Sequence, residues 1–414
     1  MRYEESSDVV NNERLSSLEE QLDVSLRAYA SVWPDINHPT KHQLNRSTNT
    51  FIEAVRAAAE AQPLPEISDD LWESTDSFRE RPVFIVGCKK SGTTLLRNLM
   101  DGHPRLVVLP SEGKYWTDFI PRVEHLDQAS QRIALGQTWI RRLTNSVAQP
   151  PFWLLGRTST EGENPYVQFL RYFLAWAEHV QGHGRGDLLL ALILALHTVT
   201  RNERGRREAP LYWVEKTPFL EHHVTDILTA FPQAQFIHVV RDPRAVIASL
   251  KKMREGKTGT SYPIARDTLV LRNSLSAGER NMKSLGKERY RIVRFEELVE
   301  QPADVMSRLA GSLDLPFDAS LLVPMVQGIP ATSNSAYKEL RSKGEIYSSS
   351  VARHERTLTA ADHVFVEGTL HRIASRFGYM LPAPRWSTFL RACIRLAPMT
   401  VDQSARALMR QMRR

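Results

Sequence analysis

Cysteine and long apolar runs are both scarce in this 414-residue chain. The two cysteines, Cys88 and Cys393, form neither a metal-ligand spacing nor a disulfide framework, and they suit a reducing compartment. The longest apolar run, Leu188 to Leu196, has about half the length that a membrane span requires, so we expect a buried helix there. The N-terminus is polar and acidic, unlike a secretory signal. These absences favour a cytoplasmic protein.

Basic residues are concentrated at one end of the sequence. The net charge is +7, and residues 385–414 hold seven arginines against a single acid, Asp402. The rest of the chain is therefore nearly neutral, and it lacks the basic stripe with interleaved aromatics that is typical of a nucleic-acid-binding protein. We expect no nucleic-acid partner.

The basic tail itself has two interpretations. The periodicity of residues 385–396 is helical and separates the arginines from an apolar side formed by Trp386, Phe389, Leu390, Cys393 and Ile394. Such a pattern is typical of a helix that makes weak contact with an anionic membrane surface. The alternative is a helix packed on the body of the protein with its arginines in solvent.

Short β-rich runs alternate with helical stretches from residue 82 onward. Strands are predicted over residues 82–86, 105–109, 211–215, 235–240 and 290–295. Helices are predicted over residues 94–101, 128–146, 165–181, 186–201, 218–230, 244–254, 265–285 and 303–312, and earlier in the chain over 13–33 and 49–62. The alternation predicts a parallel sheet covered by helices on both faces. Such sheets bind ligands in the loops that follow the strands.

A glycine-containing loop, GCKKSGTT (residues 87–94), follows the first predicted strand. Its glycines have the spacing of the nucleotide P-loop, which directs backbone N–H groups and a helix N-terminus at a phosphate. The phosphate-binding lysine of an NTPase is replaced by Thr93, whereas Lys90 lies inside the loop. This departure disfavours phosphoryl transfer from ATP and favours a ligand with one phosphate and a transferable group beyond it. A strand-to-helix turn that binds nothing is the alternative.

A second loop, RDPRAVIAS (residues 241–249), follows the predicted strand 235–240. Arg241 closes the strand, and Ser249 lies two turns into the next helix. A guanidinium group and a hydroxyl together suit a terminal phosphate. The alternative is an arginine paired with Asp242 in a surface turn.

The two loops together resemble those of the PAPS-dependent sulfotransferases, where PAPS is 3′-phosphoadenosine 5′-phosphosulfate. The resemblance covers residues 82–300, includes DGHP (residues 101–104), and is nearest the branch with tyrosylprotein and bacterial carbohydrate sulfotransferases. It implies an α/β protein with the three-layer P-loop-like sulfotransferase fold and a central parallel sheet. The domain would span residues 79–345, between a helical N-terminal extension, 1–78, and a helical, basic C-terminal extension, 346–414.

The resemblance also implies which residues bind the donor. Arg241 and Ser249 would hold the 3′-phosphate, and no metal would be required. The 5′-phosphosulfate end would be held by Lys89, Lys90, Ser91, Gly92, Thr93 and Thr94. The family's tyrosine near the last strand is Phe295 here, so one polar contact with the donor is expected to be absent. Ser335 and Lys338 are expected to close over the donor.

Three residues are expected to be catalytic by the same resemblance. Lys90 and Lys216, the latter in EKTPF (residues 215–219), would stabilise the sulfate charge. Glu112 lies where this branch places a carboxylate and would accept the acceptor proton, the more effectively if partial burial raises its pKa toward 6–7. His103 is the next candidate for the base. A solvated lysine at 216 and an ordinary loop glutamate at 112 are the alternatives.

We therefore expect a sulfotransferase that moves a sulfuryl group from PAPS to an acceptor hydroxyl and releases adenosine 3′,5′-bisphosphate. The resemblance to bacterial members suggests a carbohydrate or glycolipid acceptor, and peptide tyrosine is the alternative. From other classes, a P-loop kinase or NTPase and a non-catalytic nucleotide-binding protein stay open.

Overall fold

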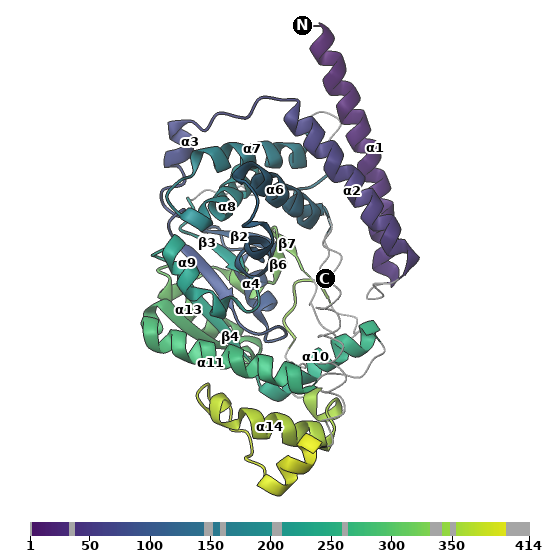
Figure 1. Ribbon diagram of the computed structural model, residues 1–414. Helices are drawn as coiled ribbons and strands as arrows, with labels where there is room; N and C mark the ends of the chain where they lie inside the picture. The colour runs from purple at the N-terminus through teal and green to yellow at the C-terminus, as the bar shows by residue number, and fades with distance from the viewer. Residues whose placement is uncertain are drawn as a thin grey trace.

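The central sheet of the computed structural model has five parallel strands in the order β2-β3-β1-β4-β5 (Figure 1). They are β1 (Pro82–Val86), β2 (Leu106–Glu112), β3 (Tyr212–Lys216), β4 (Gln235–Val240) and β5 (Tyr290–Arg294). Each corresponds to a run that the sequence predicted, so the parallel sheet is confirmed. The structure describes residues 2–32, 38–144, 152–157, 163–200, 209–258, 264–331, 342–347 and 353–394.

Alternate residues of the strands enter two hydrophobic cores, because successive side chains of a strand point to opposite faces of a sheet. In β1, Val83 and Ile85 enter one core, whereas Phe84 and Val86 enter the other. The first core is covered by α4 (Thr93–Met100), α12 (Phe295–Glu300) and α13 (Pro302–Ser312). The second is covered by α6 (Gln128–Thr144), α7 (Pro165–His179), α8 (Asp187–Thr200) and α9 (Val224–Ala230). The three-layer α/β fold is confirmed.

Two long N-terminal helices, α1 (Arg2–Val32) and α2 (Pro39–Glu60), lie side by side on one flank of the molecule (Figure 1). The second begins at Pro39 because the fixed φ of proline suits the first helical turn, and the His38 imidazole accepts a hydrogen bond from the Thr40 N–H. Leu22 of α1 and Phe51 of α2 belong to the same core as α6 and α7. The N-terminal extension thus shares a core with the α/β layers.

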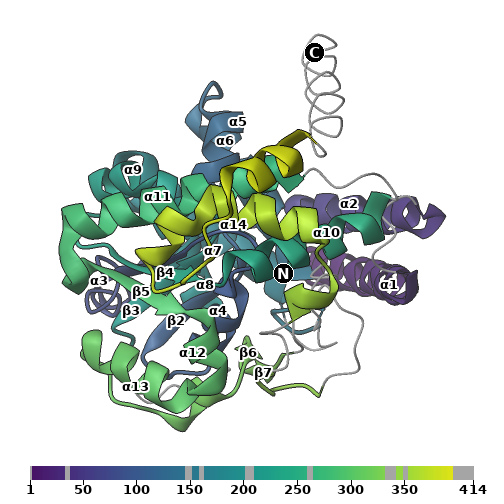
Figure 2. The ribbon, with the colours of Figure 1, turned by 90° about the horizontal axis from the view of Figure 1, so that it is seen from below.

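The C-terminal region packs on the other end of the sheet. The helices α10 (Pro243–Thr258), α11 (Ile264–Arg289) and α14 (Ala360–Ser375) lie next to one another (Figure 2). Their buried side chains form a third core. A capping box between Thr359 and Asp362 starts α14, and a further helical stretch covers residues 386–394. Among the described residues, no helix combines the length and the hydropathy that crossing a bilayer requires.

Shorter elements complete the described chain. The remaining helices are α3 (Asp69–Glu73) and α5 (Ile120–Val123), with the single turns η1 (Tyr115–Phe119), η2 (Gly184–Gly186), η3 (Leu220–His222), η4 (Ala319–Leu322) and η6 (Arg353–Arg356). A small antiparallel pair is formed by β6 (Met325–Val326) and β7 (Ile329–Pro330).

Candidate active site

The first predicted loop connects β1, in the middle of the sheet, to α4. Gly87, Lys90 and Gly92 all have positive φ, at 130°, 69° and 106°. A Cβ at Gly87 would lie 2.5 Å from the Val239 carbonyl oxygen, and one at Gly92 would collide with the Phe295 ring, so both positions require glycine. The resulting turn ends at the N-terminus of α4, whose positive end favours an anion.

Ser91 stabilises this turn from within. Its backbone N–H and its hydroxyl both donate to the Cys88 carbonyl oxygen, at 3.2 and 2.7 Å. Ser91 and Thr93 are buried, whereas Thr94 is partly exposed at the start of α4. The Lys89 ammonium lies 5.8 Å from the centroid of the Phe219 ring. The side chain of Ser91 therefore shapes the loop, in addition to its expected role toward a ligand.

The second predicted loop meets the first. Arg241 follows β4, the neighbour of β1, and its Nη1 donates to the Lys90 carbonyl oxygen at 3.1 Å. Its guanidinium group lies 4.3 Å from the centroid of the Phe295 ring. Asp242 pairs instead with Arg244, at 2.7 Å, so the alternative of an Arg241–Asp242 surface pair does not describe this turn. Phe295, which occupies the position of the family's tyrosine, supports Arg241 with its ring face.

Ser249 lies on the second turn of α10 and is buried. Ser335 and Lys338, which were expected to close over the donor, lie outside the described residues.

The ends of β2 and β3 are joined residue by residue. Glu112 is the last residue of β2, and Lys216 is the last residue of β3. The two residues are paired in the register of the sheet. Three contacts fasten the two segments: Lys216 Nζ to Glu112 Oε1 at 2.9 Å, Gly113 N–H to Glu215 Oε1 at 2.9 Å, and Lys114 N–H to Thr217 Oγ1 at 2.7 Å. The sequence predicted both Glu112 and Lys216 as catalytic residues, and the structure brings them into direct contact.

The ionisation of Glu112 differs from the sequence-based expectation. Burial works to raise the pKa of Glu112, but the Lys216 ammonium outweighs it, and with Lys114 at 3.6 Å the pKa falls to about 2. Burial lowers the pKa of Lys216, and the Glu112 carboxylate opposes that fall. Burial alone would have helped Glu112 as a base by moving its pKa toward 6–7, but this condition is not met, because the paired cation outweighs burial.

Two buried carboxyl groups beneath the loops were not singled out from the sequence. Glu215 holds Gly113, as described above, and its Oε1 also accepts the Thr217 hydroxyl at 2.6 Å. Glu221 Oε2 accepts the Gly87 N–H at 2.9 Å, and Glu221 Oε1 accepts the hydroxyl of Ser274 on α11. Burial raises the pKa of each carboxyl to about 7.

The turn that carries Glu221 also interrupts a predicted helix. Residues 218–230 were expected to be continuous, but Phe219 has a φ of 73°, and η3 separates it from α9. A left-handed residue cannot continue a right-handed helix. The position of Glu215 at the end of a predicted buried strand could have indicated a functional carboxyl group. No sequence pattern indicates Glu221, because its partners Gly87 and Ser274 are 134 and 53 residues away.

Arg142 of α6 is a further cation that the sequence did not indicate. Its Nη1 donates to the backbone carbonyl oxygens of Glu112 and Gly113, the latter at 2.5 Å. Arg142 therefore fixes the backbone that carries Glu112.

His103, the second candidate for the base, is held by backbone groups. Its Nε2 hydrogen-bonds the Pro316 carbonyl oxygen at 2.9 Å, and its Nδ1 accepts the Arg105 N–H at 3.1 Å. With both ring nitrogens engaged and the side chain buried, His103 has a structural role. Across the described parts of the chain, His, Cys, Asp and Glu side chains nowhere gather in a group of three that could hold a metal ion.

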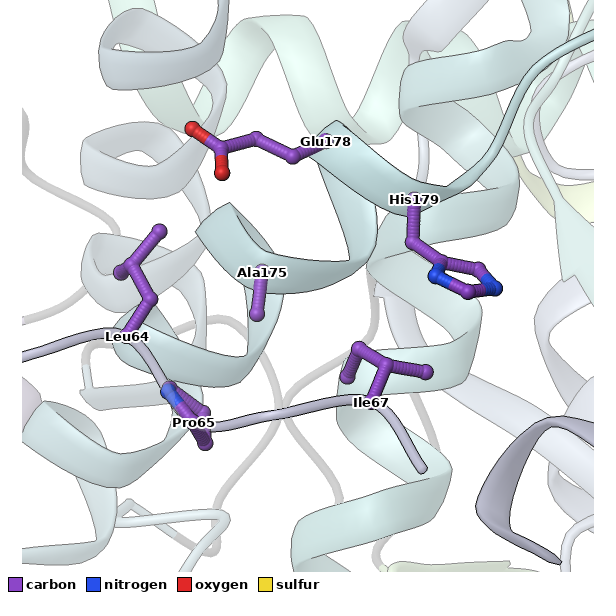
Figure 3. Close-up of a pocket in the computed structure, with 6 residues that line it drawn as sticks. All are labelled: Leu64, Pro65, Ile67, Ala175, Glu178 and His179. Carbon is purple, nitrogen blue, oxygen red and sulfur yellow. The ribbon is translucent and has the colours of Figure 1, made fainter. Parts of the chain in front are cut away.

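An open pocket of about 250 Å³ lies elsewhere, between the segment before α3 and the end of α7 (Figure 3). Its lining residues are Leu64, Pro65, Ile67, Ala175, Glu178 and His179. None of them belongs to the loops after β1, β2, β3 or β4, so the pocket is separate from the candidate active site.

Three curated proteins are similar to a little more than half of this chain. Protein-tyrosine sulfotransferase A of Caenorhabditis elegans is 27% identical over 256 residues, which cover 62% of this chain and 54% of that protein. Protein-tyrosine sulfotransferase of Drosophila melanogaster is 24% identical over 258 residues, covering 62% and 42%. Nodulation protein NoeE of Sinorhizobium fredii is 25% identical over 251 residues, covering 56% and 49%. The chain thus spans about half the length of the curated relatives it matches.

One solved structure that is similar to this one is the sulfotransferase domain from the Synechococcus PCC 7002 olefin synthase. The match has a TM-score of 0.44 and 20% identity, and it covers 73% of this chain and 96% of that chain. Residues 82–319, more than half of the sequence, match the model of the Sulfotransferase family. The chain belongs to the sulfotransferase family.

Proposed function

We propose that this protein transfers a sulfuryl group from PAPS to an acceptor hydroxyl and releases adenosine 3′,5′-bisphosphate. The observation that carries the proposal is the contact between the two anion-binding loops, Arg241 Nη1 to the Lys90 carbonyl oxygen. One loop offers glycine turns and a helix N-terminus to a 5′-phosphosulfate, and the other offers a guanidinium group to a 3′-phosphate. A nucleotide with anionic groups at both ends of its ribose fits such a pair.

The transfer requires little covalent chemistry from the protein. The acceptor oxygen attacks sulfur, a new S–O bond forms, and the bond between sulfur and the bridging oxygen of the 5′-phosphate breaks. The electron pair of that bond goes to the leaving phosphate, and the acceptor proton goes to Glu112. Lys90 and Lys216 stabilise the charge on the transferring group and the leaving oxygen, as in phosphoryl transfer.

The donor itself would activate Glu112. The Lys216 ammonium that lowers the pKa of Glu112 is also one of the two cations that we propose to stabilise the sulfate. When Lys216 turns toward the sulfate, its hold on Glu112 weakens, and the pKa of the carboxyl rises toward its ordinary value. The carboxylate then becomes a better base at the step that needs one.

A carbohydrate or glycolipid hydroxyl is the acceptor that we propose. The second candidate is a peptide tyrosine, which is supported by the two relatives named as protein-tyrosine sulfotransferases. The low pKa of Glu112 also favours it, because a phenol, with a pKa of about 10, is a stronger acid than a sugar hydroxyl and therefore demands less of a weak base. Incubation with labelled PAPS and a panel of glycans, glycolipids, phenols and tyrosyl peptides would separate the two.

Ligand-induced thermal stabilisation tests the donor assignment. Adenosine 3′,5′-bisphosphate should raise the melting temperature more than ATP with Mg²⁺ does, because Thr93 replaces the lysine that an ATP-binding loop requires. Greater stabilisation by ATP with Mg²⁺ would instead support a kinase or NTPase.

The Arg241→Ala variant tests the 3′-phosphate contact. The loss of a charge-assisted bond worth about 1.5–3 kcal/mol should weaken PAPS binding roughly ten- to hundredfold. Adenosine 5′-phosphosulfate, which lacks the 3′-phosphate, should bind the variant and the parent equally. Equal weakening of both nucleotides would show that Arg241 acts only on loop structure.

A further inference from the structure

The last described helical stretch, residues 386–394, exposes an apolar stripe. Trp386, Leu390 and Ile394 recur every four residues, so they lie on one side of the helix. Their exposed fractions are 74%, 47% and 65%, and Met380, which precedes the helix, is 85% exposed. The stripe, defined as these four residues, therefore faces solvent.

A neighbouring side of this helix is anchored to the protein, and Phe389 on that side also contacts the Trp386 ring, with ring centroids 6.1 Å apart. Phe389 stacks on Phe365 of α14 with ring centroids 6.1 Å apart, and Ala392 is buried. The sequence had placed Phe389 and Cys393 with the apolar side, but the structure turns Phe389 inward and leaves Cys393 half-buried. The exposed stripe is thus presented by an element with a fixed position.

Two described arginines flank the stripe. Arg385 and Arg391 are exposed on the same short segment. The sequence that continues to residue 414 adds five more arginines and a single acid, Asp402. Apolar side chains flanked by arginines match the boundary between the acyl chains and the anionic headgroups of a bilayer. A symmetric contact between two copies would instead bring two strongly basic segments together, and their repulsion disfavours it.

We propose that the stripe and its flanking arginines dock this protein on an anionic bilayer surface. Trp386, Leu390 and Ile394 enter the interfacial region, and Arg385 and Arg391 lie against lipid phosphates. The contact is peripheral, in keeping with the lack of a membrane-spanning helix among the described residues. The proposal goes beyond sulfuryl transfer and does not depend on it.

Vesicle flotation with the full chain tests the docking surface. Binding should be stronger to vesicles that contain phosphatidylserine than to pure phosphatidylcholine, and salt should weaken it. Trp386→Ser combined with Leu390→Ser should reduce partitioning about tenfold or more, because interfacial binding scales with buried apolar area. Arg391→Gln should reduce it about fivefold on anionic vesicles alone.

Leu269→Ser combined with Phe317→Ser is the matched control, because both residues are exposed to 47% in other parts of the protein. This control should leave vesicle binding unchanged. Failure of the parent to bind anionic vesicles, or equal binding by the Trp386/Leu390 variant, would overturn the proposal. So would a change from dimer to monomer in that variant without a change in vesicle binding, because the stripe would then join two copies. Stabilisation by adenosine 3′,5′-bisphosphate, measured in parallel, reports on the proposed activity independently.

Discussion

At the scale of single residues, the pairing of Glu112 with Lys216 determines how the site can act. Both side chains lie at the carboxyl ends of adjacent strands, and the 2.9 Å contact keeps the carboxylate ionised but weakly basic. Above a pH of about 3, a carboxyl with this pKa titrates no further, so we expect Glu112 to give the free enzyme no acidic limb in kcat/KM. In the proposed mechanism, Glu112 becomes a stronger base only when the bound donor attracts Lys216. Glu112 would then not take the proton of the acceptor hydroxyl before the donor is bound.

Glu112→Gln should separate donor binding from catalysis. The amide keeps the shape of the side chain but cannot accept a proton, so we expect the rate to fall at least about a hundredfold. Donor affinity should be retained or improved, because Lys216 loses its competing carboxylate. Steady-state kinetics and calorimetric titration of adenosine 3′,5′-bisphosphate measure the two effects.

Glu124→Gln provides the control for this experiment, since Glu124 pairs with Arg185 at the surface. It should leave both quantities unchanged. Near-parental turnover of Glu112→Gln would mean that another group accepts the proton. His103 would be an unsuitable replacement while both its ring nitrogens bind backbone groups.

At the scale of elements, the C-terminal segment fastens the loop that begins with Arg241. Glu296 on α12 accepts the Asp242 N–H at 2.9 Å through one oxygen and the Tyr379 hydroxyl at 2.6 Å through the other. The Arg294 guanidinium lies 4.6 Å from the centroid of the Tyr379 ring. Tyr379 lies beyond residues 82–319, which match the family. A segment outside the matched region thus positions the loop that begins with Arg241.

Tyr379→Phe should weaken recognition of the 3′-phosphate. Burial raises the pKa of Tyr379, so its hydroxyl remains a donor to the Glu296 carboxylate throughout the physiological range. Without this bond, Glu296 loses one of the two contacts that position it against the Asp242 N–H. We expect the KM for PAPS to rise about fivefold, because only a part of the 1.5–3 kcal/mol that such a bond contributes would reach the donor site. Binding of adenosine 5′-phosphosulfate should not change.

Tyr166→Phe is the matched control for Tyr379→Phe. Tyr166 is also buried, and its hydroxyl donates to the Gly156 carbonyl oxygen at 2.9 Å, in the core beneath the N-terminal helices. Both variants should lose stability, but only Tyr379→Phe should alter discrimination between the two nucleotides. A uniform loss of affinity for both nucleotides in Tyr379→Phe would indicate general destabilisation instead.

At the scale of the whole molecule, periodicity and loop chemistry predicted most of the architecture. The five strands and the loops that follow β1 and β4 could be located because each depends on neighbouring residues, such as the glycines at 87 and 92. The strand order that brings Arg241 to Lys90 depends on pairing across 151 residues, which no local pattern encodes. For the same reason the buried Glu221 and the low pKa of Glu112 were missed, because both depend on distant partners.

The two buried carboxyl groups with raised pKa predict how stability depends on pH. Burial raises the pKa of Glu215 and Glu221 to about 7 from an ordinary value of 4.5, so the folded protein holds these protons more tightly than the unfolded chain does. The stability that each contributes is present below pH 4.5 and is lost as the pH rises through about 7. The contribution of Glu112 to stability depends on pH in the opposite direction. Its pKa is lowered in the folded protein, so its contribution is present above pH 4.5 and is lost as the pH falls through about 2.

Glu221→Gln should reduce the loss of stability between roughly pH 5 and pH 8, because the amide does not titrate. The parent should lose on the order of 3 kcal/mol for each such carboxyl over this range. The stability of the variant relative to the parent should therefore improve by a similar amount as the pH rises, since its amide oxygen can still accept the Gly87 N–H. Urea unfolding at a series of pH values measures the slope, with Glu124→Gln as a surface control that keeps the parental slope. If stability changes with pH by the same slope in Glu221→Gln and the parent, Glu221 stays ionised in the folded protein. The loop of residues 87–94 would then be held at the Gly87 N–H by a charged carboxylate.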